Sequence, residues 1–470
     1  MFAKIQRIHF VGIGGIGMSG IAEVLLTLGY RVSGSDLRHS PVTARLVSLG
    51  AQIFEGHRAE NVQGSEAVVT SSAISRDNPE VAEAHRLKLP VIQRAEMLSE
   101  LMRLKYGIAV AGMHGKTTTT SMVASVLAAG GLDPTVVVGG RVDAMGSNAR
   151  LGTSQYLVAE ADESDRSFLQ LSPILSVVTN IDREHLDCYR DMEDIERTFI
   201  EFMDRVPFYG TVVACHDNQA LRALLPRVRR RVVTYGCHTD ANFHISGYST
   251  VRAGDCIRQC FSVVFDGREL GGFEIRAAGE HNVLNATAAI AVGIGLDIPV
   301  EKIREGIAGF GGVDRRFQLK GRGDGVLVVD DYGHHPTEIA ATLAAARHWL
   351  EPGGRLHVVF QPHRYTRTYL LMDEFAAAFP NADRLLVLDV YAASEQPIAG
   401  VSGLTLASRI RCAADRPAEF AASAAAAIDA AVEEARPGDL ILTLGAGNVS
   451  QLAPQIVERL KARGAAAARQ

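Results

Sequence analysis

The sequence predicts an α/β protein of three domains, and three observations lead to this fold class. Short apolar runs rich in Val, Ile and Leu alternate with helical segments along most of the chain, as in doubly wound parallel sheets. Two glycine-rich loops, at residues 12–17 and 112–118, each follow an apolar run and precede a helical pattern. The 470 residues, of which 47% are hydrophobic, suffice for about three domains with a core in each.

The first predicted domain, residues 1–101, opens with a β-rich run at residues 7–11 that enters Gly12-Ile13-Gly14-Gly15-Ile16-Gly17. This is a complete G-x-G-x-x-G between a predicted strand and a helix that extends to about residue 28. Further strands, separated by helical segments, are predicted at residues 30–35, 51–54, 66–71 and 90–93. This alternation predicts a Rossmann-like parallel sheet.

The second predicted domain, residues 102–313, contains a loop suited to a nucleoside triphosphate. An apolar strand at residues 106–111 leads into Gly112-Met113-His114-Gly115-Lys116-Thr117-Thr118 and then into a helix. Such a loop offers backbone N–H groups and the positive end of a helix to a phosphate chain, and Lys116 adds an ammonium group. The loop is two residues shorter than the common G-x-x-x-x-G-K-[ST] pattern, so its assignment depends on the motifs that follow.

Polar side chains follow two later strands of this domain, predicted at residues 156–160 and 175–180. The first strand ends in Glu160-Ala-Asp-Glu-Ser-Asp165, and the second is followed by Asp182-Arg-Glu-His185. Because parallel sheets bind ligands at the carboxyl ends of their strands, we expect Thr117, Glu163 and His185 to hold Mg²⁺ beside ATP. The alternatives are a solvated acidic loop and a hydrogen-bonded structural histidine.

Residues 242–275 alternate polar and apolar around several glycines and predict a small antiparallel patch. A helix from residue 282 to about 293 then resumes the α/β pattern. His281, Asn282 and Asn285 at its start are candidates for holding a base and a ribose. The alternative is an N-capped helix that packs closely through its alanines.

The third predicted domain, residues 314–470, is a second Rossmann-like unit. Its predicted strands lie at residues 326–329, 356–360, 385–389 and 440–444, and its alanine-rich helices at 338–349, 371–379 and 419–435. Two polar loops, residues 330–336 and 361–367, follow adjacent strands. Arg364 and Arg367 in the second loop are planar forks suited to a carboxylate, unless they are a surface pair bound to local acids.

Charge and composition argue against several classes of protein. A net charge of −5 and a pI near 6.3 disfavour a general nucleic-acid or anionic-membrane binder. The six cysteines form no C-x-x-C pair and predict the reduced thiols of a cytoplasmic protein. No segment approaches about 18 uninterrupted apolar residues, so no membrane insertion is expected. The sequence leaves open whether the protein is a monomer or a homodimer.

Taken together, these strings resemble the Mur ligases of bacterial cell-wall synthesis over almost the whole chain. The ordered matches are more specific than either glycine loop alone. They lie at residues 9–17, 34–36, 71–74, 112–118, 160–165, 281–286, 315–317, 330–338, 360–368 and 389–393. The resemblance implies an N-terminal UDP-binding domain, a central ATPase domain and a C-terminal domain that closes over an amino acid.

The alanine-adding branch of the family is the one most similar to this chain. It implies ligation of L-alanine to the lactyl carboxylate of UDP-N-acetylmuramate through an acyl phosphate, with ATP as co-substrate and Mg²⁺ as cofactor. By the same resemblance Lys116, Glu163 and His185 are catalytic. The implied UDP-sugar contacts are Gly12, Gly14, Gly15, Ile16, Gly17, Asp36, His57, Ser71 and Ser72. The glycine loop of residues 112–118 with His281, Asn282, Asn285, Arg316 and Asp331 would bind ATP, and Arg364, Arg367, Tyr332 and His334 would bind the amino acid.

One departure from the wider family concerns lysine. Several Mur ligases resemble one another in having a carbamylated lysine near a second magnesium ion, but Lys116 is the only lysine between Lys105 and Lys302. Such a carbamate is not expected in the alanine-adding branch.

Three other interpretations remain at this point. A recycling ligase that attaches a preformed tripeptide to UDP-N-acetylmuramate resembles this chain at both glycine loops. An NAD-dependent oxidoreductase would explain the first glycine loop and Asp36, but it would leave the second loop and the later motifs unexplained. A nucleotide-regulated binding protein without chemistry is the third.

Overall fold

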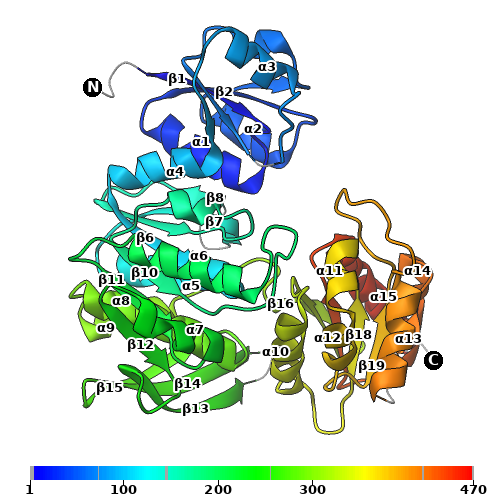
Figure 1. Cartoon of the computed structure of the whole chain (residues 1–470). Helices are drawn as coiled ribbons and strands as arrows, with labels where there is room; N and C mark the ends of the chain where they lie inside the picture. The colour runs from blue at the N-terminus through cyan, green and yellow to red at the C-terminus, as the bar shows by residue number, and fades with distance from the viewer. Residues whose placement is uncertain (1–4, 72, 143–146, 254–255, 415–417, 468–470) are drawn as a thin grey trace. The chain divides into compact units, whose positions relative to one another are not determined.

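The computed structural model describes residues 5–467 except 72, 143–146, 254–255 and 415–417 (Figure 1). The chain forms two compact units. The first comprises Met1–Gly247, Ser262–Phe273 and Leu284–Gly311, and the second comprises Tyr248–Phe261, Glu274–Val283 and Gly312–Gln470. The strands form three sheets, and each predicted domain supplies one of them. Strands and helices alternate along the chain, which agrees with the predicted α/β fold class. No helix in the described part of the chain is both long and apolar enough to cross a membrane.

The N-terminal sheet has five parallel strands in the order β3-β2-β1-β4-β5. Its strands are β1 (Arg7–Val11), β2 (Arg31–Asp36), β3 (Gln52–Glu55), β4 (Ala67–Thr70) and β5 (Val91–Gln93). Its helices are α1 (Ile16–Thr27), α2 (Pro41–Ser48), α3 (Pro79–Arg86) and α4 (Arg94–Arg103), with a 3₁₀ turn, η2 (Ala59–Val62). Ser40 and Thr43 form a capping box at the start of α2, so this helix begins where its first N–H groups find acceptors.

The second sheet has ten strands in the order β15-β14-β13-β12-β11-β10-β6-β9-β7-β8. The strands are β6 (Tyr106–Ala111), β7 (Thr135–Val142), β8 (Ser147–Arg150), β9 (Tyr156–Glu160), β10 (Leu175–Val178), β11 (Thr211–Cys215), β12 (Val232–Gly236), β13 (Phe243–Ala253), β14 (Cys256–Phe265) and β15 (Arg268–Ile275). The helices are α5 (Lys116–Ala129), α6 (Met192–Asp204), α7 (Gln219–Leu224), α8 (Glu280–Gly295) and α9 (Val300–Ala308), and the 3₁₀ turns are η3 (Ser167–Gln170) and η4 (Leu225–Arg227). Strands β6, β9 and β10 are parallel, whereas β8 pairs antiparallel with β7 at the edge.

The third sheet has six strands in the order β16-β17-β21-β18-β19-β20. The strands are β16 (Gln318–Gly323), β17 (Val326–Asp331), β18 (Leu356–Phe360), β19 (Arg384–Val387), β20 (Ala418–Phe420) and β21 (Leu440–Leu444). The helices are α10 (Pro336–Arg347), α11 (Tyr365–Leu370), α12 (Met372–Ala377), α13 (Gly403–Ala414), α14 (Ala424–Glu434) and α15 (Leu452–Ala467), with a 3₁₀ turn, η5 (Asn448–Gln451). Strand β16 pairs antiparallel with β17, with a register shift between Leu319 and Gly321. The other strand pairs of this sheet are parallel.

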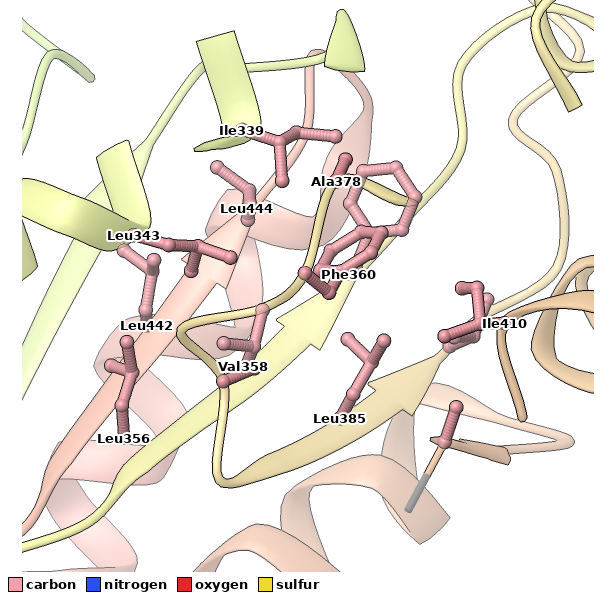
Figure 2. Packing of buried hydrophobic residues seen from close by; sticks show 14 of the residues in the cluster. Ile339, Leu343, Leu356, Val358, Phe360, Ala378, Leu385, Ile410, Leu442 and Leu444 are labelled. Carbon is pink, nitrogen blue, oxygen red and sulfur yellow. The ribbon is translucent and has the colours of Figure 1, made fainter. Parts of the chain in front are cut away.

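Both faces of the third sheet are buried, because successive side chains of a strand point to opposite faces. Val358 and Phe360 of β18 join the core on one face with Ile339 of α10, as Figure 2 shows. Val359 joins the core on the other face with residues of α14 and α15. Burying a side chain of this size contributes about 1.5–3 kcal/mol, so the apolar run of β18 fixes its central position.

Two details of this sheet differ from the sequence prediction. The helix expected at residues 419–435 is preceded by strand β20, and α14 begins only at Ala424. The Ser423 hydroxyl accepts a hydrogen bond from the N–H of Ala426 and so fixes the helix start. The edge strand β16 was not predicted, because its polar sequence lacks the alternation of a half-buried strand.

Candidate active site

The second glycine loop connects β6 to α5 and requires two of its glycines. Gly112 and Gly115 have φ angles of +132° and +81°, a backbone conformation that side chains disfavour. A Cβ atom at Gly112 would lie 2.1 Å from Oγ1 of Thr179, and one at Gly115 would lie 2.8 Å from Oδ1 of Asn285. The loop therefore packs against the end of β10 and against the predicted ATP residue Asn285.

The side chain of Asn180, just after β10, holds this loop in place. Its Oδ1 accepts a hydrogen bond from the N–H of His114 at 2.9 Å, and its Nδ2 donates to the His114 carbonyl at 3.0 Å. Met113 is buried at 5% exposure, so its side chain packs in the interior. Sequence reasoning did not select Asn180, although its place at the end of a parallel strand was a signal for it.

Lys116 lies at the start of α5 and forms a buried ion pair. Its Nζ is 2.7 Å from Oε1 of Glu163 and also donates to the carbonyls of Gly112 and Met113. Burial disfavours the ammonium charge, but the carboxylates of Glu163 and Glu160 outweigh burial and raise the pKa of Lys116. Lys116 is therefore a cation at neutral pH.

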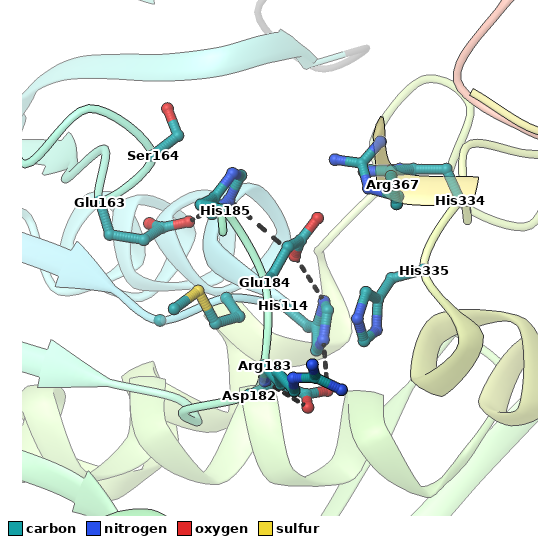
Figure 3. Close-up of polar contacts among 12 residues, drawn as sticks. His114, Glu163, Ser164, Asp182, Arg183, Glu184, His185, His334, His335 and Arg367 are labelled. Atoms are coloured by element: carbon teal, nitrogen blue, oxygen red, sulfur yellow. Dashed lines mark hydrogen bonds and ion pairs between the residues drawn. The ribbon is translucent and has the colours of Figure 1, made fainter. Parts of the chain in front are cut away.

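Glu163 and His185 lie together, as the sequence predicted (Figure 3). Nε2 of His185 is 3.3 Å from Oε1 of Glu163, whose side chain is 1% exposed. His185 has a φ of +55°, which is uncommon for a residue with a side chain. The hydroxyl of Tyr189 donates to the Glu163 carbonyl at 2.6 Å, and the guanidinium of Arg166 stacks on the Tyr189 ring. The Tyr189 hydroxyl thus holds the backbone of Glu163, while the Glu163 carboxylate contacts His185 and Lys116.

The donor set fits a divalent cation. Oε2 of Glu163 is buried and makes no hydrogen bond to any described residue, so this carboxylate oxygen is available to a ligand. The buried hydroxyl of Thr117 donates to Oε2 of Glu160 at 2.9 Å, which leaves its oxygen lone pairs as acceptors. Carboxylate and hydroxyl oxygens are the ligands that Mg²⁺ prefers. Thr118 is also buried in the first turn of α5.

His114 contacts two acids that sequence reasoning did not select. Its Nε2 is 3.0 Å from Oδ2 of Asp182, and its Nδ1 is 4.0 Å from Oε2 of Glu184 (Figure 3). Both acids belong to the polar segment after β10. Their place in that segment was visible in the sequence, but their pairing with a loop histidine depends on the tertiary fold.

The first turns of α8 carry the three residues predicted to hold the base and ribose. Nδ2 of Asn282 donates to the Ala278 carbonyl at 2.6 Å and is 3.1 Å from Nε2 of His281. Burial, with the nearby charge of Arg316, lowers the pKa of His281 to about 4, so its imidazole is neutral at pH 7. A neutral imidazole can both donate and accept a hydrogen bond.

The first glycine loop connects β1 to α1 and is held by Asp36 at the end of β2. Oδ2 of Asp36 accepts a hydrogen bond from the N–H of Gly14 at 2.8 Å, and a Cβ atom at Gly14 would lie 2.7 Å from the same oxygen. Gly12 has a φ of +77°, and the carbonyl of Gly12 accepts from the N–H of Gly15. The Asp36 carboxylate thus holds the backbone of the glycine loop through the N–H of Gly14.

Gly17 lies in the first turn of α1 and faces an arginine of α4. A Cβ atom at Gly17 would lie 2.9 Å from Nη1 of Arg94. The backbone of Ile16 begins α1, but its side chain and the whole of Ser72 lie outside the described residues. Ser71 follows β4, and its carbonyl accepts from the N–H of Ile74, whose side chain lies against Gly12.

His57 belongs to a buried polar network around Glu80. Its Nδ1 is 2.9 Å from Oγ of Ser35 and 3.4 Å from Oε2 of Glu80, and Nε2 of His9 is 3.6 Å from the same carboxylate oxygen. Burial disfavours the Glu80 charge, but the nearby imidazole of His9 and hydrogen bonds from Ser35 and Asn61 lower its pKa to about 2. Sequence reasoning missed Glu80, because helix α3 reads as an ordinary surface helix.

Asp331 lies at the end of β17 in the second unit. Its Oδ1 accepts from the N–H of Gly333 at 2.7 Å, and its Oδ2 accepts from the N–H of Phe317 at 2.7 Å. Burial raises the pKa of Asp331, although the charge of Arg316 and these hydrogen bonds oppose that shift. The carboxylate therefore fixes the segment that carries Arg316 and Tyr332.

The predicted amino-acid residues Tyr332 and His334 lie near His363. The Tyr332 and His334 rings are 5.2 Å apart, and the His334 and His363 rings are 6.0 Å apart. Nη1 of Arg367 is 3.3 Å from Nδ1 of His363, whose ring stacks on Tyr391 at 5.5 Å. Burial, aided by nearby cationic groups, lowers the pKa of His363 to about 3. Sequence reasoning did not select His363 or Tyr391.

Arg364 precedes α11 with a φ of +69°, and its Nε is 4.0 Å from Oε1 of Glu395. The same carboxylate caps α11 by accepting from the N–H and the hydroxyl of Thr366. Arg364 thus lies at the N-cap, and Arg367 inside a short helix whose start is held by Glu395.

Three family models match the chain in sequence order. The model described as "Mur ligase family, catalytic domain" matches residues 7–106, "Mur ligase middle domain" matches 110–293, and "Mur ligase, glutamate ligase domain" matches 315–447. Together they span most of the chain.

Individual proteins are similar over nearly the full length. A curated protein of Koribacter versatilis, named UDP-N-acetylmuramate–L-alanine ligase, is 67% identical and covers 99% of this chain and 100% of its own length. The crystal structure of UDP-N-acetylmuramate-alanine ligase from Thermotoga maritima has a TM-score of 0.79 at 29% identity, covering 97% of this chain and 99% of that one. A murein peptide ligase from Psychrobacter arcticus has a TM-score of 0.68 at 25% identity, covering 97% and 99%.

Proposed function

The chain belongs to the Mur ligase family, and from this premise we propose how its residues join L-alanine to UDP-N-acetylmuramate with consumption of ATP. This ligation is a step of peptidoglycan precursor synthesis. The observation that carries the proposal is the buried ion pair of Lys116 and Glu163 at the second glycine loop. We place the reaction in the cytoplasm and divide the chain into domains at residues 1–101, 102–313 and 314–470.

The proposed chemistry has two steps, because a carboxylate is a poor acylating agent. An oxygen of the lactyl carboxylate first forms a bond to the γ-phosphorus of ATP, and ADP leaves. The alanine amine then attacks the acyl carbon of the resulting acyl phosphate. The bond from that carbon to the phosphate oxygen breaks, phosphate leaves, and the nitrogen gives up a proton. The products are an amide, ADP and phosphate.

Lys116 supports the first step by stabilising negative charge on the transferred phosphoryl group. Its raised pKa supports this role, because the ammonium keeps its charge at neutral pH. The N–H groups at the start of α5 bind phosphate oxygens. We assign His281, Asn282, Asn285, Arg316 and Asp331 to the remainder of the ATP site.

Thr117, Glu163 and His185 are the residues that would hold Mg²⁺. The cation, when bound, supplies positive charge to the phosphate oxygens of ATP. The free, buried Oε2 of Glu163 supports this assignment. Tyr189 and Arg166 hold the Glu163 segment in place for this task.

The first glycine loop binds the pyrophosphate of the UDP-sugar in this proposal. Gly12, Gly14, Gly15, Ile16 and Gly17 provide the loop, and Asp36 holds its backbone. His57, Ser71 and Ser72 are assigned to the rest of the nucleotide sugar. Arg364 and Arg367 orient the alanine carboxylate, with Tyr332 and His334 beside them.

The test measures phosphate release by the purified chain with ATP, Mg²⁺ and UDP-N-acetylmuramate. L-alanine, other amino acids, the murein tripeptide and no acceptor are compared, and the mass of each product is recorded. Release that depends on L-alanine, with a matching amide product, is the expected result. Activity confined to the tripeptide would move the chain to the recycling ligases, and no release with any acceptor would contradict the proposal.

A further inference from the structure

We propose that Arg94 is a further substrate-binding residue, which donates hydrogen bonds from Nη1 to the pyrophosphate of the UDP-sugar while Asp162 holds its Nη2. This inference rests on the proposed assignment of the first glycine loop to the UDP-sugar. It adds a side-chain cation to a site for which the family resemblance implied only backbone groups, an acid, a histidine and serines.

The first argument is the close approach of Arg94 to the glycine loop. Arg94 is the first residue of α4, and its side chain crosses the first turn of α1. A Cβ atom at Gly17 would lie 2.9 Å from Nη1 and 3.0 Å from Cδ of Arg94. The absence of a side chain at Gly17, the third glycine of the motif, thus leaves room for the arginine, and Nη1 is the guanidinium atom nearest to this position.

The second argument is electrostatic. The start of α1 is the positive end of a helix dipole, its first N–H groups have no intrahelical acceptors, and its first turn contains no acidic residue. Gly15 caps the helix without a side-chain hydrogen bond. A guanidinium placed at this end is repelled by the dipole unless an anion lies between them. A pyrophosphate carries negative charge on several oxygens, so it could contact both the start of α1 and the Arg94 guanidinium.

The third argument is that one nitrogen of the guanidinium, Nη2, already has an acidic partner in the protein. Nη2 of Arg94 is 3.1 Å from Oδ2 of Asp162, in the acidic segment after β9. The N–H and hydroxyl of Ser164 donate to the other oxygen, Oδ1, at 3.1 and 2.6 Å. Asp162 is thus an anchored anion that orients the arginine fork and leaves Nη1 directed at the loop.

The experiment compares Arg94→Ala and Arg94→Lys with the wild-type chain. A charge-assisted hydrogen bond contributes about 1.5–3 kcal/mol, which is about a 10- to 100-fold change in affinity. We expect Arg94→Ala to raise the KM for UDP-N-acetylmuramate by about that factor and to leave the KM for ATP within about 2-fold. Arg94→Lys keeps the charge but loses the fork, so an intermediate KM is expected.

Calorimetric titration separates a phosphate contact from a general loosening of the domain. Arg94→Ala should weaken binding of UDP by the same factor as UDP-N-acetylmuramate and leave binding of uridine unchanged. Arg86→Ala, which removes an exposed arginine of the neighbouring helix α3, is the matched control. If Arg94→Ala fails to fold, the same titrations on Arg94→Lys decide the question.

Equal losses for UDP and uridine, or an unchanged KM for the UDP-sugar, would overturn the inference. These outcomes are distinct from failure of the proposed function. If the proposed function is wrong, the wild-type chain shows no alanine-dependent phosphate release. If only the role of Arg94 is wrong, the wild-type chain ligates alanine and Arg94→Ala either binds the UDP-sugar as it does or loses UDP and uridine equally.

Discussion

Lys116 and Glu163 share a buried ion pair at the second glycine loop, so a substitution of either residue leaves the other charge without its partner. This pairing places two residues of the proposed phosphoryl-transfer site in direct contact. It also links the loop after β6 to the segment after β9. The balance of charge at this loop therefore depends on the Lys116 and Glu163 side chains.

We predict that Lys116→Ala lowers the rate of ligation by about 10³-fold, because the charge on the transferred phosphoryl group loses its cation. Binding of UDP-N-acetylmuramate, measured by calorimetry, should remain nearly unchanged, since the first glycine loop is assigned to that substrate. Lys302→Ala is the control, because Lys302 forms an exposed pair with Glu305 in α9. Loss of UDP-sugar binding in Lys116→Ala would contradict the separation of the two sites.

We also predict that Arg364→Ala raises the KM for L-alanine by about 10-fold or more, with a much smaller effect on the KM for ATP. The reason is the loss of a charge-assisted hydrogen bond to the amino-acid carboxylate. Steady-state kinetics with each substrate varied in turn provides the measurement. Arg409→Ala, at an exposed pair with Asp373, should change neither constant. Equal effects on alanine and ATP would argue against the carboxylate assignment.

Residue types at strand ends could be predicted, but their hydrogen-bond partners could not. Glu163 and His185 come together as expected, since they follow β9 and β10, the two parallel strands on either side of β6. Asp36 and Asp331 were selected as ligand contacts, yet their carboxylates also bind nearby backbone N–H groups. Such a choice depends on the exact path of a loop, which spacing along the chain does not determine.

At the scale of elements, helix α3 is joined to the N-terminal sheet by one buried carboxylate. Glu80 lies on α3, His9 on β1 and Ser35 on β2, so the Glu80 network connects three elements. Asn61 of the turn η2 donates to the same carboxylate. Strand β1 leads into the first glycine loop, and strand β2 ends at Asp36. The Glu80 network therefore contacts both strands that position this loop.

We predict that Glu80→Gln lowers the free energy of unfolding at pH 7 by about 1–3 kcal/mol, because buried donors lose an ionised acceptor. Its folded-state pKa of about 2 is below the ordinary value of 4.5. The stability it contributes is therefore fully present above pH 4.5 and is lost as the pH falls towards 2.

Thermal unfolding at a series of pH values provides the measurement for Glu80. The difference between wild type and Glu80→Gln should be largest above about pH 5 and should shrink as the pH falls. Glu96→Gln, at an exposed position of α4, is the control. A difference that is constant with pH would show that the Glu80 charge does not contribute.

The strands with continuous apolar runs could be predicted, whereas the polar edge strands β8 and β16 could not. Strands β6, β9 and β18 were predicted with the bounds that the structure shows, because each is a short run of buried residues. The edge strands β8 and β16 are polar and pair antiparallel with a neighbour. Only the neighbouring strand, and not their own sequence, gives them their conformation.

At the scale of the whole molecule, the proposed ATP ligands divide between the two compact units. Lys116 and Thr117 belong to the first unit, and Arg316 and Asp331 belong to the second. Because the proposed function assigns ATP contacts to residues of both units, we expect a conformational change when ATP binds.

We predict that a non-hydrolysable ATP analogue with Mg²⁺ and UDP-N-acetylmuramate reduces the radius of gyration of the chain in solution. Small-angle scattering with and without these ligands provides the measurement. UDP-N-acetylmuramate alone should cause a smaller change, because its assigned contacts lie in the first unit. An unchanged radius with all ligands bound would contradict the expected conformational change.

The antiparallel edge strand β16 bears on the tendency of the protein to aggregate. An open, regular strand edge is a template onto which another chain can add a strand and so begin an aggregate. In β16 the register shift between Leu319 and Gly321 breaks the regular row of backbone groups, and Lys320 and Arg322 add positive charge. A second molecule that approached in the same way would meet like charges and a mismatched edge. The register shift and the two cations therefore make this edge a poor template for a strand of another molecule.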